Sequence, residues 1–251
     1  GGTDRMAAAD SPVRLVIHGA SGRMGQALVR LCAEAPALRL VAAVAGSEAP
    51  HIAGVPGFAA GELASLPAFD ACIDFSLPAG FDRVLDRCLA QDAAFVSGTT
   101  GLDARQLARL DEVATRIPVL WAANFSLGVA VLQDLVRRAA AALPQWHRDI
   151  VETHHVHKKD APSGTALALG ESIVEGGGAA PHYASLRAGD IVGEHLVQFT
   201  GAGERIELIH RATHRDIFAR GALHCASALA HRAPGRYRVI DLLSGMTGRG
   251  A

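Results

Sequence analysis

The chain has 251 residues, of which 49% are hydrophobic and 20% are charged, so it is long enough for one large domain or two modest ones with real cores. Its formal net charge is −1 before its 12 histidines are counted, which gives no general basic field to attract nucleic acid or an anionic membrane. We therefore expect small molecules and further copies of the chain as partners, with no nucleic acid and no membrane.

The first half of the chain alternates short apolar runs with segments of helical periodicity. Strands are predicted at residues 13–17, 38–45, 71–75, 94–97 and 119–122, and helices at residues 24–35, 81–91 and 104–114. Strands that are apolar throughout and separated by helices are typical of a parallel sheet covered on both faces. With right-handed crossovers, the pattern predicts an α/β fold with a doubly wound, Rossmann-like sheet.

The pattern changes after Asn124. Helices are predicted at residues 129–143, 163–174 and 218–229, and strands at residues 149–153, 185–188, 195–200, 205–211 and 237–242. Residues 201–204 have the character of a hairpin connection, so antiparallel pairing is expected there. We therefore predict two domains with a boundary near Phe125.

Three glycines lie between the first predicted strand and the first predicted helix, at Gly19, Gly22 and Gly25. In a dinucleotide-binding loop the first allows a tight turn, the second lets the backbone approach a pyrophosphate, and the third lets the helix pack closely on the strand. The pyrophosphate would bind the N–H groups at the helix start near Arg23. The strand–turn–helix context favours this interpretation over a glycine-rich turn without a ligand.

The end of the second predicted strand bears on the choice of cofactor. An NAD site usually carries Asp or Glu there, which binds the ribose hydroxyls. Here residues 44–47 read VAGS, and the first acid is Glu48. The sequence is therefore compatible with NADPH or NADH, with Arg23 as a cation and Ser47 as a hydrogen-bonding group for a 2′-phosphate. The alternative for Arg23 is an ordinary solvated helix residue.

Two further loops follow strands of the same predicted sheet, with the sequences SGTTG at residues 97–101 and AANFS at residues 122–126. Ligands of open α/β sheets bind at the carboxyl ends of the strands, where both loops belong. Small and hydroxyl-bearing residues there would let a nicotinamide ring approach the backbone. Ordinary turn chemistry is the alternative for each loop alone, and their shared edge favours a cofactor.

The most polar segment, residues 152–164, reads ETHHVHKKDAPSG. A strand that ends at Thr153 would deliver His154 and His155 to opposite sides. Ser163 is predicted to cap the helix that follows. The leading N–H groups of Gly164 and Thr165 would then face a carboxylate.

Three interpretations of this segment compete. A zinc site would use the histidines and the aspartate, but two lysines share the loop and there is neither a nearby cysteine nor an HExxH motif, so no metal is predicted. A solvated loop at a domain edge is the second interpretation. The third is acid catalysis on an anionic substrate, in which a lysine stores a proton and a histidine relays it. The third uses every residue type present and fits a reduction, which needs a hydride and then a proton.

The cysteines and the chain ends bear on the compartment. The four cysteines show no C-x-x-C pairing, which predicts a reducing cytoplasm. No apolar run approaches the ~20 residues of a spanning helix. The N-terminus lacks the charged start and apolar core of a secretory signal. Residues 1–5 precede Met6, are interpreted as a remnant of recombinant expression, and are set aside.

Several of these segments occur together in one known family. The motifs GASGRMG, DFSLP, SGTTG, AANFS, HHVHKKDAPSGTA and AGDIVGEH run over almost the whole chain. The chain thereby resembles the dihydrodipicolinate reductase (4-hydroxy-tetrahydrodipicolinate reductase) family of bacterial lysine biosynthesis. HHxHKxDAPSGT is a long signature that is specific to that family.

The resemblance implies NAD(P)H-dependent reduction of 4-hydroxy-tetrahydrodipicolinate (dihydrodipicolinate) to tetrahydrodipicolinate, a step of lysine and diaminopimelate biosynthesis. It implies that His154 is the catalytic acid or relay and that Lys158 is the proton donor. The substrate would be bound by His155, Ser163, Gly164 and Thr165. The cofactor would be contacted by Gly19, Ala20, Ser21, Gly22, Arg23, Met24, Gly98, Thr99, Thr100, Ala122, Ala123, Asn124 and Phe125.

The resemblance also implies a domain layout and an assembly. The last segment of the family rejoins the first domain, so residues 6–125 and 216–251 would form the dinucleotide-binding domain. Residues 126–215 would form a smaller α+β domain for substrate binding and oligomerisation. Its mixed sheet would pair with other copies to form a homotetramer. The chain departs from many relatives at Ala45 and Gly46, where an acid followed by a basic residue is frequent, so the preference between NADPH and NADH stays open.

Three other functions stay open on the residues alone. One is a different two-domain NAD(P)-dependent dehydrogenase of amino-acid metabolism, for example one that acts on a semialdehyde. The second is a non-catalytic dinucleotide sensor, which would bind the cofactor without turnover. The third is a metallohydrolase, which would contain stoichiometric zinc.

Overall fold

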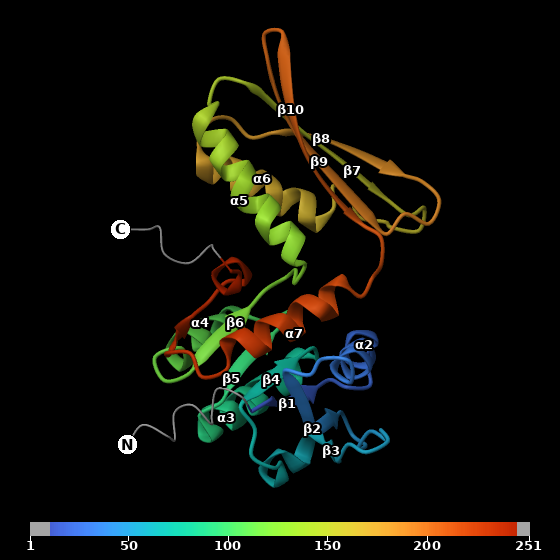
Figure 1. The fold of residues 1–251 in the computed structure, drawn as a ribbon, viewed down its shortest axis with the longest axis vertical. Coiled ribbons are helices and arrows are strands. Elements are labelled where there is room, and N and C mark those ends of the chain that lie inside the picture. The colour runs from blue at the N-terminus through green and yellow to red at the C-terminus, as the bar shows by residue number, and fades with distance from the viewer. Residues whose placement is uncertain (1–10, 245–251) are drawn as a thin grey trace. The chain divides into compact units, whose positions relative to one another are not determined.

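The computed structural model describes residues 11–244, which divide into two compact units (Figure 1). The first unit extends to Phe125 and resumes at Phe218, and the second is Ser126–Ile217. The predicted domains divide the chain between residues 125 and 126 and between residues 215 and 216. The interpretation of residues 1–5, and the predicted domain ends at residues 6 and 251, lie outside the described residues.

The first unit is built on a seven-stranded parallel sheet. In spatial order its strands are β11 (Gly235–Arg236), β6 (Pro118–Trp121), β5 (Ala94–Ser97), β4 (Ala71–Asp74), β1 (Val13–His18), β2 (Leu38–Ala45) and β3 (Gly57–Ala59). Its helices are α2 (Arg23–Cys32), α3 (Pro78–Gln91), α4 (Ala104–Val113) and α7 (Ile217–Leu229). The chain runs outward from β1 in both directions, so β1 and β4 flank the switch point of a doubly wound sheet. The predicted fold class is confirmed.

The strands of this sheet are buried as their apolar sequences predict. All residues of β4 and β5 are buried. Phe81 of α3 meets Phe95 of β5 edge to face, with ring centroids 5.6 Å apart. The predicted start of α4 after Asp103 is confirmed, because the Asp103 carboxylate accepts a hydrogen bond from the backbone N–H of Gln106 at 2.8 Å.

The predicted strand at residues 237–242 is wrong. β11 ends at Arg236, and Val239–Leu242 form a short 3₁₀ helix, η2. Asp241 stabilises its start by accepting a hydrogen bond from the backbone N–H of Arg238 at 2.8 Å. The two ends of η2 lie three residues apart and are both buried, which fits a helical turn and not the alternating burial of a strand.

Two short elements after β2 have no counterpart in the prediction. They are the edge strand β3 and the 3₁₀ helix η1 (Ala60–Ser65). A strand of three residues is too short to show the alternation by which strands are recognised in a sequence.

The second unit has a four-stranded mixed sheet with two helices on one face (Figure 1). In spatial order its strands are β10 (Glu204–Ala212), β9 (Gly193–Gly201), β7 (His147–His154) and β8 (His182–Arg187). β9 is antiparallel to both of its neighbours, and β8 is parallel to β7, so the predicted mixed sheet is confirmed. The helices are α5 (Leu127–Ala142) and α6 (Gly164–Gly176).

Alternate residues of β7 and β9 face these helices and form the core of the second unit. Ile150 and Phe199 are completely buried there, against Val136 of α5 and Ile173 of α6. The other face of the sheet carries half-buried and exposed side chains. Within residues 11–244, no helix of either unit is long and apolar enough to cross a membrane.

Candidate active site

The glycine loop of the first unit connects β1 to α2. Gly19 has a φ of +84°, and a Cβ there would lie 2.1 Å from the carbonyl oxygen of Phe75. A Cβ on Gly25 would lie 2.1 Å from the carbonyl oxygen of Gly19. A Cβ on Gly22 would meet nothing closer than 3.6 Å. Close packing therefore requires two of the glycines, and the third borders open space where a pyrophosphate would bind.

The start of α2 also has the hydrogen-bonding groups that a pyrophosphate needs. The helix begins at Arg23, its first turn holds no acid, and no side chain in the described part of the chain caps it. The leading amides of Arg23 and Met24 lie at the positive end of the helix dipole. The loop and the helix start thus fit the phosphates of a dinucleotide.

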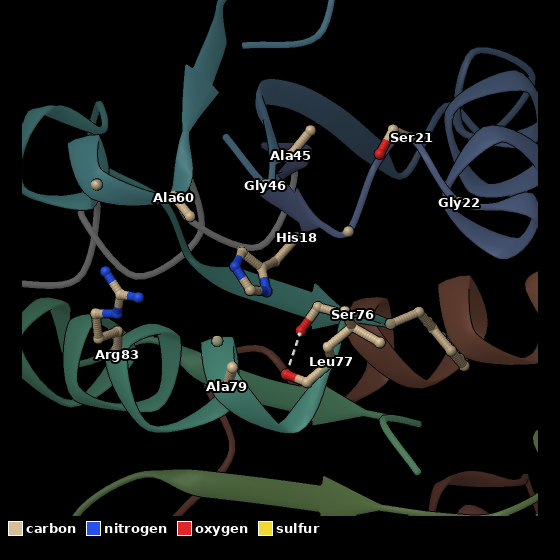
Figure 2. Close-up of a pocket in the computed structure, with 14 residues that line it drawn as sticks. His18, Ser21, Gly22, Ala45, Gly46, Ala60, Ser76, Leu77, Ala79 and Arg83 are labelled. Atoms are coloured by element: carbon tan, nitrogen blue, oxygen red, sulfur yellow. Dashed lines mark hydrogen bonds between the residues drawn. The ribbon is translucent and has the colours of Figure 1, made fainter. Parts of the chain in front are cut away.

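A cavity of about 620 Å³ adjoins the loop (Figure 2). It lies over the carboxyl ends of β1, β2 and β4, where ligands of doubly wound sheets bind. It is lined by His18, Gly19, Ser21, Gly22, Ala45, Gly46, Ala60, Gly61, Phe75, Ser76, Leu77, Ala79, Gly80 and Arg83. Three predicted cofactor residues, Gly19, Ser21 and Gly22, are therefore brought to it, whereas Ala20, Arg23 and Met24 do not line it.

The other predicted cofactor residues follow β5 and β6. These strands are neighbours, so residues 98–100 and 122–125 leave the sheet at the same edge. None of them lines the cavity of about 620 Å³. The buried Thr99 hydroxyl donates a hydrogen bond to Asp74 at 2.7 Å, so this side chain links the loop after β5 to the end of β4. Contact of these loops with the cofactor stays a prediction.

A buried carboxylate joins the ends of three strands beneath this edge. Asp74, the last residue of β4, accepts hydrogen bonds from the hydroxyls of Ser76, Ser97 and Thr99 at 2.6, 2.7 and 2.7 Å. Its Oδ1 lies 2.7 Å from Nδ1 of His18, whose ring lines the cavity. Burial acts to raise the pKa of Asp74, but the hydrogen bond and charge of His18, with the hydroxyls, outweigh it and lower the pKa.

Neither His18 nor Asp74 is among the predicted site residues. Each is the last residue of an apolar strand. A polar residue that ends a buried strand at the ligand-binding edge is the signal that marks both of them.

The carboxylate of Glu152 is the centre of a polar network in the second unit. It is completely buried, and Arg187 donates hydrogen bonds to its two oxygens at 2.9 and 3.0 Å. Nδ1 of His154 contacts Oε2, and the backbone N–H of Ser163 donates to Oε1 at 3.2 Å. Burial acts to raise the pKa of Glu152, but the hydrogen bonds from Arg187 and His154 outweigh it and lower the pKa to about 2. Glu152 is therefore an anion at neutral pH.

Arg187 also fixes the path of the loop that carries the predicted proton donor. Its guanidinium donates to the backbone carbonyl oxygens of Lys158 and Asp160 at 3.1 and 2.6 Å. The ammonium of Lys158 pairs with the Asp160 carboxylate at 2.9 Å, with the lysine side chain 23% exposed. Lys158 is thus held by the strand network and still reaches solvent.

His154 packs against a second buried histidine, His195 of β9. Their rings meet edge to face with centroids 5.2 Å apart. Nε2 of His195 lies 2.8 Å from Oγ of Ser163, which also accepts the backbone N–H of Ala166 and so caps α6. Burial, with the charge of His154, lowers the pKa of His195 to about 4, so this ring is neutral at pH 7.

The predicted cap at Ser163 is confirmed, and its hydroxyl is committed to α6 and His195. Glu152, Arg187 and His195 are missing from the predicted site. They come from three different strands, and only the strand register brings them together. No local spacing in the sequence carries that information.

The predicted substrate-binding groups lie around the start of α6 and the end of β7. Gly164 is exposed, and a Cβ there would meet nothing within 4 Å, so its amide and that of Thr165 begin the helix beside open space. Partial desolvation, with the positive charges of Arg215 and His157, lowers the pKa of His155. Contact of Gly164, Thr165 and His155 with a substrate stays a prediction. In the described residues, no three His, Cys, Asp or Glu side chains are grouped as a metal site.

Two family models match the chain, one for each half. Residues 13–125 match dihydrodipicolinate reductase, N-terminus, and residues 128–243 match dihydrodipicolinate reductase, C-terminus. The chain belongs to the dihydrodipicolinate reductase family. The resemblance drawn from the sequence motifs is confirmed.

Close relatives of the chain are named 4-hydroxy-tetrahydrodipicolinate reductase. The protein of Stenotrophomonas maltophilia (strain K279a) is 64% identical over 236 residues, which are 93% of this chain and 98% of the relative. The protein of Xanthomonas campestris pv. campestris (strain B100) is 63% identical over 235 residues, with the same two coverages. That of Xylella fastidiosa (strain 9a5c) is 61% identical over 237 residues, 93% of this chain and 99% of the relative.

Solved structures show the same fold at low sequence identity. A dipicolinate-bound dihydrodipicolinate reductase from Paenisporosarcina sp. TG-14 has a TM-score of 0.80 and 23% identity, over 91% of this chain and 98% of that chain. An engineered D-amino acid dehydrogenase bound to NADP⁺ has a TM-score of 0.60 and 14% identity, over 96% of this chain and 97% of that chain. The fold of the dihydrodipicolinate reductase family is thus shared with other dehydrogenases.

Substitution Gly25→Ala should destabilise the protein by about 1–3 kcal/mol, the usual cost of overpacking, because its Cβ would lie 2.1 Å from a backbone oxygen. Urea unfolding measures the change. Gly22→Ala is the matched control, since its Cβ meets nothing closer than 3.6 Å. Equal unfolding free energies for the two variants would contradict the packing argument.

Substitution Glu152→Gln should lower the unfolding free energy at pH 7 by about 2 kcal/mol. This is less than the usual cost of breaking a buried pair, because Arg187 keeps its carbonyl acceptors. The folded-state pKa of Glu152 lies below its ordinary value of 4.5, so the advantage of the natural chain should be complete above about pH 4.5 and vanish as the pH falls toward about 2. Urea unfolding across this range checks the prediction. A difference between the two chains that did not change with pH would refute it.

Proposed function

We propose that this chain reduces 4-hydroxy-tetrahydrodipicolinate to tetrahydrodipicolinate with NADPH or NADH, as a step of lysine and diaminopimelate biosynthesis. The observation that carries the proposal is the 64% identity to a 4-hydroxy-tetrahydrodipicolinate reductase over 98% of that relative's length. The geometry of both units agrees with it. One holds a loop and cavity suited to a dinucleotide, and the other holds cationic groups and helix amides suited to a dicarboxylate.

The first unit is the proposed cofactor site. The amides at the start of α2 bind the pyrophosphate, and the cavity over β1, β2 and β4 receives the adenosine half. The loops after β5 and β6 approach the nicotinamide half. When bound, the cofactor supplies the hydride of the reduction.

The second unit is the proposed substrate site. The amides of Gly164 and Thr165 lie in the first turn of α6, at the positive end of the helix dipole, and bind a substrate carboxylate there. Lys158 adds positive charge from the preceding loop, which favours a dianion over a neutral ring, and His155 adds a hydrogen-bonding group. Ser163 contributes indirectly, because its hydroxyl caps α6 and so fixes the direction of these amides.

Proton delivery falls to Lys158 and His154. The Lys158 ammonium is partly exposed and pairs with Asp160, so it can give its proton to the reduced ring and regain one from solvent. Glu152 binds Nδ1 of His154 and fixes the orientation of the ring, which leaves Nε2 to relay a proton or bind the substrate. The neutral His195 packs beside it without adding a second positive charge.

A homotetramer is proposed from the uncovered face of the sheet in the second unit. By the strand register, Val151, Leu196 and Ile209 lie side by side on the face opposite α5 and α6, with Leu186 on the neighbouring strand. Ile209 is 40% and Leu186 is 55% exposed in the single chain. An apolar centre with charged groups at its margin, such as Arg211 and Glu194, is the usual composition of a subunit interface.

The cytoplasm is the proposed location. The four cysteines are free and buried, which is the state that a reducing compartment preserves. The nicotinamide cofactors of biosynthesis are also found there.

An absorbance assay tests the function. Oxidation of NADPH and of NADH is followed with enzymatically generated 4-hydroxy-tetrahydrodipicolinate, and with an amino-acid semialdehyde as the competing substrate class. Turnover with the cyclic dicarboxylate alone is expected. Turnover only with the semialdehyde, or cofactor binding without any turnover, would overturn the proposal.

Substitutions Lys158→Ala and His154→Ala should each lower kcat by about 10²–10⁴-fold, the usual range for a lost acid–base group. Cofactor affinity, measured by fluorescence titration, should scarcely change. Lys159→Ala is the matched control, because Lys159 is exposed and adjacent to the donor. Normal turnover in both Lys158→Ala and His154→Ala would refute the assigned roles.

Substitution Leu186→Asp should dissociate the tetramer, because it places a charge in the apolar centre of the proposed interface. Light scattering after size-exclusion chromatography measures the mass. Leu167→Asp on α6 is the control, since Leu167 is 44% exposed and lies on a helix outside the sheet face. A tetramer that survives Leu186→Asp unchanged would exclude this face as the interface.

A further inference from the structure

The cavity of about 620 Å³ in the first unit holds one permanent charge, the guanidinium of Arg83. Its other lining side chains are apolar, hydroxyl-bearing or absent, apart from the imidazole of His18, and they include no carboxylate. Figure 2 shows the guanidinium pointing away from α3 toward the segment that carries Ala60. A cation in a cavity with no carboxylate among its lining side chains indicates an anionic group on the ligand.

The acidic neighbours of Arg83 on α3 are committed to other partners. Asp82 pairs with Arg105 at 3.0 Å, and Asp86 pairs with Arg109. No hydrogen bond or ion pair among the described residues of the chain uses the Arg83 guanidinium. Arg105 and Arg109 thus neutralise the acids that α3 offers, and Arg83 keeps its charge for the cavity.

The end of β2 offers space and no negative charge on the opposite side of the same cavity. Ala45 and Gly46 line it there, and a Cβ on Gly46 or Gly61 would meet nothing within 4 Å. In doubly wound folds this strand end adjoins the 2′ position of the adenosine ribose. The nearest acid along the chain, Glu48, does not line this cavity, but lines an adjoining one of about 440 Å³ that shares Ser21, Ala45 and Gly46 with it.

We propose that Arg83 binds the 2′-phosphate of NADPH and makes this chain prefer NADPH to NADH. The proposal rests on the proposed function and refines it. A guanidinium presents paired N–H donors that match two phosphate oxygens, whereas the ribose hydroxyl of NADH offers no anion to bind. The cation comes from α3, across the cavity from β2. Arg23, the cation suggested by the sequence, does not line this cavity.

Binding of two adenosine fragments to the full-length chain tests the proposal. Isothermal titration calorimetry compares 2′,5′-ADP with 5′-AMP, which differ only in the 2′-phosphate. The natural chain should bind 2′,5′-ADP more tightly, and Arg83→Gln should reduce that preference by about 10- to 100-fold, the effect of losing a charge-assisted hydrogen-bonded pair. Affinity for 5′-AMP should change by less than about threefold, and Arg83→Lys should restore part of the preference.

The matched control is Arg39→Gln, which removes an exposed positive charge at the opposite end of β2. It should leave both fragment affinities unchanged, which separates a local contact from a change in net charge. In steady-state kinetics, Arg83→Gln should raise the KM for NADPH, and leave the KM for NADH and both kcat values nearly unaltered.

Three results would overturn this proposal alone. If Arg83→Gln lowered the affinity for both fragments equally, the guanidinium would lie against the adenine ring. A preference that persists in Arg83→Gln and disappears in Arg23→Gln would move the phosphate site to α2. If the natural chain bound 5′-AMP as tightly as 2′,5′-ADP, it would have no 2′-phosphate site. Failure to bind either fragment would instead overturn the dinucleotide site of the proposed function, and the proposal with it.

Discussion

The second unit depends on one buried negative charge. Glu152 lies between α6 and the sheet, where an isolated carboxylate would cost several kcal/mol. Arg187, His154 and the amide of Ser163 neutralise and hydrogen-bond it. Each of these partners also has a second role, since Arg187 anchors the loop, His154 belongs to the proposed catalytic pair, and Ser163 caps the helix that is proposed to bind the substrate. The relative positions of the active groups are therefore a consequence of satisfying this single carboxylate.

The first unit uses a related arrangement with weaker donors. Asp74 is also buried at a strand end and also binds a histidine, His18, but its other donors are three hydroxyls and no guanidinium. Because the hydroxyls come from the ends of β4 and β5 and the loop beyond, they hold the ligand-binding edge of the sheet in register. The carboxylate beneath the cavity is thus hydrogen-bonded by four side chains, and the proposed role of Arg83 on the cavity wall is to select an anionic ligand.

Much of this could be predicted from the sequence, for identifiable reasons. Strands buried on both faces give continuous apolar runs, so β1, β2 and β5 were located within a residue or two. The polar segment at 152–164 stood out because charged groups are costly and rarely so concentrated. Arg187 and His195 could not be found, since only pairing across β8 and β9 places them beside Glu152. Arg83 could not be found for a similar reason, because its helix lies far along the chain from the glycine loop that lines the same cavity.

The two hydrogen bonds from Arg187 to carbonyl oxygens of the loop limit where insertions and deletions can occur in this family. The backbone at residues 158 and 160 is attached to a side chain from β8, so its spacing is set from outside the loop. Length variation there would move the Lys158 ammonium relative to the helix start, whereas no side chain of residues 11–244 donates a hydrogen bond to the backbone at the tip of the β9–β10 hairpin. Insertions accumulated during divergence should therefore collect at residues 201–203 and avoid 155–162, and a designer who grafts this site must carry β8 along with the loop.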